Sequence, residues 1–179
     1  MKKIFFILPL LAVILFSNIS RAQKLVPFTS TLQEKYGLTK ADLKSIQFYV
    51  SEEVVLTKEL TGSKNEVVAG KIKLVNNKRV DEVVIKSKTR CLIIDTNTKG
   101  HPKLAFSSND ENTLTFGLNK ETKKYILLAE NWQGRVGTVN YGAEKYQTGG
   151  YSYDACLLVK LKDIRKVKHN KKVEKGRKL

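Results

Sequence analysis

Aromatic residues and glycines are concentrated in the last third of the chain. Among the residues of this sequence, they are the ones whose types are best suited to a binding site. Trp132, Tyr141, Tyr146, Tyr151 and Tyr153 lie within 22 residues, among five glycines. Aromatic faces stack on sugars or fill a core, and glycine lets the backbone bend or come close to a neighbour. The pattern predicts either an aromatic core or a ligand surface that includes Trp132, Tyr141 and Tyr146.

The basic end of the chain, residues 163–179, is a second candidate binding surface. From Lys160 to Leu179 ten Lys or Arg stand against two acidic residues, a net charge of +8, within a whole-chain charge of +16. Such a segment attracts polyanions, with a solvated basic face as the alternative. The lysines that we expect to meet an anion there are Lys166, Lys168, Lys171 and Lys172.

The other reactive residue types form no recognisable catalytic or metal-binding pattern. The sequence has no Gly-x-Ser-x-Gly elbow, no phosphate-binding Gly-rich loop and no His-Glu-x-x-His, and its only histidines are His101 and His169. Residues 95–100, DTNTKG, begin like a calcium loop, but Phe106 stands where the bidentate Glu belongs. We therefore expect no metal and no cofactor, and we favour a non-enzymatic protein.

The two cysteines leave two states open. A bridge between Cys91 and Cys156 would close a loop of about 65 residues and add roughly 4 kcal/mol in the chain-entropy model. Strand alternation places Cys91 on the face of Ile85 and Ile93, and Cys156 on the opposite parity. The sequence is compatible with a disulfide and with two thiols packed as small hydrophobes.

The start of the chain has the pattern of a signal peptide. Lys2 and Lys3 precede a thirteen-residue apolar run from Ile4 to Phe16, and Ser20 and Ala22 are the small residues that a signal peptidase needs. The apolar run is shorter than the roughly twenty residues of a membrane-spanning helix. We expect cleavage after this segment.

Residues 1–22 would thus be removed, and residues 23–179 would be exported as a single β-rich domain without a transmembrane segment. The expected address is the periplasm or the medium of a bacterium. Export argues against nucleic acid as the polyanion. It favours anionic lipid, lipopolysaccharide or an acidic glycan, with a protein partner also open.

The elements that must position these residues are mainly strands. Residues 80–95 contain the densest β-branched run and predict a core strand with a bend near Ser87 to Thr89, and residues 151–161 predict a second strand. About nine short runs with connections too short for crossover helices favour antiparallel pairing. The predicted fold class is mainly β, an antiparallel barrel or roll, with a sandwich as the alternative.

One or two short helices should precede the strands. Residues 30–36 can form a helix that Gly37 ends. A second helix should begin at Lys40, because Thr39 is a good N-cap and Asp42 stands where a carboxylate reaches back to the cap. Strand residues replace the helical pattern from about Ile46.

Four segments carry a family resemblance: LTKADLKSIQFYVSEEVVLTKEL at 38–60, GKIKL at 70–74, YILLAENW at 125–132 and GTVNYGAEKY at 137–146. Together they resemble a group of small exported proteins of Bacteroidetes-type bacteria. The resemblance covers nearly all of the mature chain. It implies an envelope address and supplies no activity, cofactor or catalytic residue.

Three hypotheses of function follow. The first is a non-enzymatic envelope protein that binds an anionic or glycan component, or a protein partner. The second is a hydrolase of envelope glycans or lipids, which needs a carboxylate or hydroxyl buried in a cleft beside its partners. The third is a carrier of an apolar ligand, which needs an apolar cavity of at least roughly a few hundred Å³.

Overall fold

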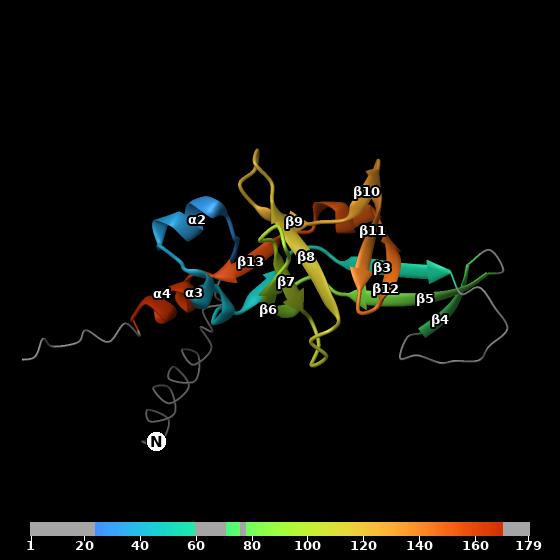
Figure 1. Cartoon of the computed structure of the whole chain (residues 1–179), viewed down its shortest axis with the longest axis horizontal. Helices are drawn as coiled ribbons and strands as arrows, with labels where there is room; N and C mark the ends of the chain where they lie inside the picture. Colours follow the sequence, from blue (N-terminus) through green and yellow to red (C-terminus); the bar gives the residue numbers. More distant parts are fainter. Residues whose placement is uncertain (1–23, 60–70, 76–77, 170–179) are drawn as a thin grey trace, which may run out of the picture.

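The computed structural model describes residues 24–59, 71–75 and 78–169. The predicted signal peptide, residues 1–22, lies outside this part of the chain, as do Lys171 and Lys172. The described residues form two antiparallel sheets and a few short helices, which confirms the mainly β class (Figure 1).

The larger sheet has seven strands in the order β1-β13-β2-β6-β7-β8-β9. Its strands are β1 (Leu25–Pro27), β2 (Phe48–Val50), β6 (Arg90–Thr96), β7 (Pro102–Ala105), β8 (Thr113–Leu118), β9 (Tyr125–Leu127) and β13 (Leu157–Lys160). Two isolated bridges, Thr29 with Lys124 and Ile126 with Cys156, join its edges without a continuous ladder. The described strands therefore form a strongly curved sheet and no closed barrel.

The smaller sheet has six strands in the order β10-β11-β12-β3-β5-β4. Its strands are β3 (Val54–Glu59), β4 (Lys71–Val75), β5 (Lys78–Ile85), β10 (Glu130–Gln133), β11 (Val136–Tyr141) and β12 (Glu144–Thr148). Figure 1 shows the α-helices at one end of the molecule and the smaller sheet at the other. The larger sheet lies between them and faces the helices.

The predicted strand at residues 80–95 is divided between the two sheets. β5 ends at Ile85 in the smaller sheet, and β6 begins at Arg90 in the larger one. The turn lies where the bend was expected. Lys88 has a φ of 62°, and its amide donates to the Val50 carbonyl at 2.7 Å. Ile85, Cys91 and Ile93 are buried, as their alternation predicts.

The prediction of a continuous strand over residues 151–161 is wrong at both ends. Gly150–Asp154 is a 3-10 helix, η1, and α4 begins at Leu161, so only β13 remains as strand. Gly150 has a φ of 59°, and the Ser152 hydroxyl accepts a hydrogen bond from the Val55 amide at 3.1 Å, which fixes the turn. The glycines therefore override the alternation of Tyr151 and Tyr153.

Both predicted helices are present, as α2 (Ser30–Lys35) and α3 (Lys40–Lys44). The capping box of α3 is formed as predicted: the Asp42 amide donates to Thr39 Oγ1 at 3.2 Å, and the Thr39 amide donates to Asp42 Oδ2 at 2.9 Å. A third helix, α4 (Leu161–His169), was not predicted. Its residue Lys168 donates to the Gly37 carbonyl at 2.7 Å and to Asp42 Oδ2 at 3.3 Å, so α4 holds the start of α3.

One buried cluster includes residues of both sheets and of the helical end. The larger sheet supplies most of the large side chains, and the smaller sheet supplies Val54, Leu56, Ile85, Val139 and Tyr146. From α4, Ile164 is fully buried. The cluster positions the helices against the larger sheet, where the candidate site lies.

Candidate functional site

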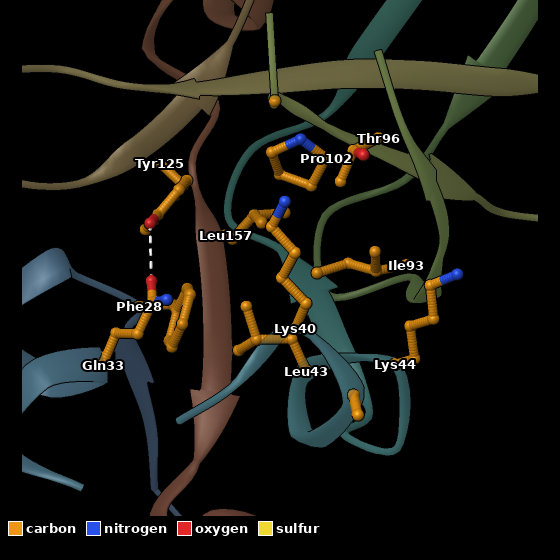
Figure 2. A pocket seen from close by; sticks show the side chains of 12 residues that line it. Phe28, Gln33, Lys40, Leu43, Lys44, Ile93, Thr96, Pro102, Tyr125 and Leu157 are labelled. Atoms are coloured by element: carbon orange, nitrogen blue, oxygen red, sulfur yellow. Dashed lines mark hydrogen bonds between the residues drawn. The ribbon is translucent and has the colours of Figure 1, made fainter. Parts of the chain in front are cut away.

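A cavity of about 410 Å³ lies between α3 and the larger sheet (Figure 2). Its apolar lining comes from α3, β6, β7, β9, β13 and the segment before α2. The residues that line it are Phe28, Gln33, Lys40, Ala41, Leu43, Lys44, Ile93, Thr96, Gly100, Pro102, Tyr125 and Leu157. A volume of this size is within the range of small-molecule sites.

Phe28 forms a wall of this pocket that ring contacts and backbone hydrogen bonds hold in place. Its ring stacks on Tyr125 with centroids 5.1 Å apart and meets the edge of Phe48 at 5.0 Å. Its amide donates to the Leu157 carbonyl at 2.8 Å, and its carbonyl accepts from the Tyr125 amide at 3.3 Å. Phe28 therefore connects β13 and β9 behind the pocket, and the wall is preformed.

The polar groups on the same side satisfy each other. The Tyr125 hydroxyl donates to Gln33 Oε1 at 2.6 Å, the hydrogen bond drawn in Figure 2. Burial raises the pKa of Tyr125 above its ordinary value, and the nearby carboxylate of Glu34 raises it further. Tyr125 is therefore a neutral hydrogen-bond donor at physiological pH, and its hydroxyl hydrogen is already donated to Gln33.

Two lysines of α3 form the charged side of the pocket. Lys40 and Lys44 are four residues apart, so they lie on one face of the helix. Figure 2 shows the Lys40 side chain extending across the pocket, with Lys44 at its edge. No Asp or Glu is among the described residues that line the cavity. The pocket thus combines apolar walls with an excess of positive charge.

The aromatic residues predicted from the sequence lie elsewhere, on the smaller sheet. Tyr141 and Tyr146 meet edge to face at 6.2 Å, and the Tyr146 hydroxyl donates to Asp81 Oδ2 at 2.9 Å. Tyr146 is buried, and burial together with the Asp81 carboxylate raises its pKa to about 12. Burial also raises the pKa of Tyr141. Tyr146 therefore packs in the core and offers little surface.

Trp132 belongs to a separate cluster on the outside of β10. Its ring meets the edge of Tyr153 at 5.0 Å, and the Arg135 guanidinium lies 5.5 Å from the centre of the Tyr153 ring. Arg135 also forms an ion pair with Asp154. Tyr151 is 78% exposed and lies beyond this cluster. The predicted aromatic surface is thus two separate groups, and in the first of them Tyr146 is buried and Tyr141 is half-buried.

Of the predicted lysines, Lys166 and Lys168 belong to α4, at the helical end of the molecule (Figure 1), whereas Lys171 and Lys172 lie outside the described residues. Lys166 is exposed on α4, whereas Lys168 is half-buried and bonded to Gly37 and Asp42. The structure therefore brings the two predicted binding surfaces to different ends of the molecule. Sequence reasoning missed the pocket itself, because its lining comes from separate segments and its residues form no local motif.

Both cysteines are free and buried. Cys91 lies opposite Phe48 of β2 in the strand register. The backbone amide of Cys156 donates to the hydroxyl of Ser51, and Ser51 follows Phe48 by three residues. Two strand spacings and three residues of rise put the two Cα atoms roughly 14 Å apart, beyond the roughly 7 Å limit for a disulfide. In this fold each thiol is packed as a small hydrophobe.

A second cavity, of about 570 Å³, lies between the β6–β7 turn, β8 and β11. Its lining mixes Lys99, Lys103, Glu111 and Glu130 with threonines and asparagines. In the same turn, Asn97 Oδ1 accepts from the amides of Lys99 and His101, which gives residues 95–100 the geometry of a turn. Within residues 24–59, 71–75 and 78–169, no three His, Cys, Asp or Glu side chains are grouped to hold a metal ion.

Comparisons with protein-family models, with curated proteins and with solved structures found no match. The helices in the described part of the chain include none that is long and apolar enough to cross a membrane. The function must therefore be argued from the pocket and from the charges around it.

Proposed function

We propose that the mature chain is an exported binding protein for a small, mainly apolar molecule, which occupies the pocket between α3 and the larger sheet. The observation that carries this proposal is the cavity of about 410 Å³ with Phe28, Leu43, Ile93 and Leu157 in its walls. Transfer of apolar ligand surface from water into such a pocket is favourable by roughly 25 cal/mol per Å². This is the carrier hypothesis, in an open sheet in place of a barrel.

The chemistry of the lining favours binding over hydrolysis. A hydrolase acting in this pocket would need a general base such as a carboxylate or imidazole within reach of the bond it cleaves. The side chains around the cavity supply amide, hydroxyl and ammonium groups with apolar surface. These groups can hold and orient a ligand, and none of them is positioned to activate water.

The signal-peptide pattern and the resemblance to exported proteins of Bacteroidetes-type bacteria support an envelope address. The ligand would then be an apolar molecule of the periplasm or the cell surface.

The dye phenylnaphthylamine, which is neutral and fluoresces in apolar sites, tests this proposal. Ala41 is an exposed residue of α3 whose methyl group faces the cavity, so Ala41→Trp fills the pocket from a position that costs the fold little. We expect the dye to saturate the wild type, and Ala41→Trp to weaken binding at least about tenfold, about 1.4 kcal/mol.

Ala143→Trp is the matched control, because Ala143 is equally exposed in the turn between β11 and β12 and lies outside the pocket. It should bind the dye like the wild type. Equal affinity in Ala41→Trp and Ala143→Trp would place the dye elsewhere and contradict the proposed site.

We further propose that the outer face of α4 contacts an anionic envelope component. Lys162, Arg165 and Lys166 are exposed there, while Ile164 is fully buried, so the helix presents its charges outward. Arg165 and Lys166 belong to the described part of the basic segment 163–179, and Lys162 directly precedes that segment. Anionic lipid, lipopolysaccharide and acidic glycan share the required charge.

Retention on a heparin column measures this contact. Arg165→Glu with Lys166→Glu should lower the eluting salt concentration clearly, because each reversal replaces an attraction by a repulsion. Lys86→Glu with Lys88→Glu, in the exposed β5–β6 turn, makes the same change of net charge elsewhere. If both double variants elute together, net charge alone governs retention and the α4 face has no special role. Truncation is better placed after His169 than within α4, because Ile164 belongs to the core.

A further inference from the structure

The ammonium groups of Lys40 and Lys44 have no partner at the pocket. Among the described residues, neither forms a hydrogen bond or an ion pair. Other lysines do: Lys58 pairs with Glu144, Lys145 with Glu130, and Lys168 with Asp42. Exposed lysines elsewhere in the described part of the chain, such as Lys86 and Lys162, do not, so the feature that sets Lys40 and Lys44 apart is their place beside an apolar cavity.

The position of these two lysines is fixed by the contacts of α3. The reciprocal hydrogen bonds between Thr39 and Asp42 set its first turn, and Lys168 of α4 holds Asp42 from outside. The hydrogen bonds with Thr39 lower the pKa of Asp42, and the contact with Lys168 lowers it further to a smaller extent. The Asp42 carboxylate is thus already paired, and it does not neutralise Lys40 or Lys44.

We infer that the ligand of the pocket is an amphiphile with one alkyl chain and an anionic head group, the chain against the apolar walls and the head beside Lys40 and Lys44. This inference rests on the proposed function. The cavity of about 410 Å³ lies near the lower end of the range for small-molecule sites, which favours one chain. The lysine ammonium is a point charge that binds carboxylate and phosphate alike. The feature that the possible ligands share is therefore the negative charge of the head group.

Competition against the bound neutral dye distinguishes these ligand chemistries. The probes are dodecanoate, dodecyl phosphate, dodecanol and dodecylamine, which share one chain length and differ in the head. At low salt both anions should bind about tenfold more tightly than dodecanol, about 1.4 kcal/mol, and dodecylamine should bind most weakly. The preference for the anions over dodecanol should narrow at high salt, because Lys40 and Lys44 are exposed and salt screens exposed charges.

The double substitution Lys40→Gln with Lys44→Gln assigns the preference to these residues. It should bring dodecanoate and dodecyl phosphate to the affinity of dodecanol, with all three affinities measured by displacement of the dye from this same variant. Lys86→Gln with Lys88→Gln removes the same charge from exposed lysines outside the pocket and should keep the preference.

Three results would overturn the inference. Equal binding of dodecanol and the anions by the wild type would leave a neutral ligand and would keep the proposed function. A preference that survives in Lys40→Gln with Lys44→Gln would place the head group elsewhere. A wild type that binds neither the dye nor any probe would overturn the proposed function together with the inference.

Discussion

Phe28→Ala should lower the free energy of unfolding by about 3–5 kcal/mol, the cost of deleting a fully buried ring. Phe28 is 1% exposed, stacks on Tyr125 and meets the edge of Phe48, so the substitution removes both ring contacts and leaves a void beside the pocket. Urea denaturation at neutral pH measures the loss. The void would be continuous with the cavity and should therefore be open to ligand.

Phe106→Ala is the matched control, since Phe106 is a half-buried phenylalanine that packs at the edge of the core and does not line the pocket. Its loss should be clearly smaller. If Phe28→Ala remains within about 1 kcal/mol of the wild type, the wall that Phe28 forms is not preformed, and the ring contacts of Phe28 do not support the pocket. Excess ligand should also raise the stability of Phe28→Ala, since it binds the folded state only.

Alkaline pH should destabilise the wild type more than Cys91→Ala. Burial raises the pKa of the Cys91 thiol from 9.0 to about 12. Because the folded state keeps the thiol protonated, its contribution is complete below pH 9 and is lost as the pH rises from 9 towards 12. The stability difference between wild type and Cys91→Ala should shrink by about 1.4 kcal/mol per pH unit above pH 9.

Urea denaturation under reducing conditions between pH 7 and about 10.5 follows this change. Ile93→Val, a neutral substitution two residues along β6, should differ from the wild type by the same amount at every pH. A difference between wild type and Cys91→Ala that stays constant across this range would show that the thiol is accessible to water in the folded chain. The raised pKa of Tyr146 acts in the same direction but is common to all three proteins.

Local signals predicted local structure well. Thr39 and Asp42 identified the start of α3 because a capping box depends on residues three apart, and both hydrogen bonds are present. Alternation correctly marked Ile85, Cys91 and Ile93 as buried. It failed at residues 151–161, where Gly150 and the bond to Ser152 Oγ turn the chain into η1.

The pocket could not be predicted because it is a product of the sheet order. Phe28 and Leu157 are adjacent only because β1 pairs with β13, with Val26 opposite Val159, and Ile93 joins them through β2 and β6. Lys40 and Lys44 gave no signal in a chain with 33 Lys and Arg. Their significance depends on what lies beneath α3. The basic end and the aromatic stretch stood out by composition, and composition carries no information about proximity.

The most direct test of ligand binding is a native mass spectrum of the mature chain after expression and purification from a periplasm. We predict a co-purified species whose added mass is that of a single-chain anionic amphiphile, on a chain that carries two free thiols. Ala41→Trp should lack this species, and Ala143→Trp should retain it. A bare wild-type protein, or an adduct of equal abundance in Ala41→Trp, would contradict the account of the pocket as the binding site.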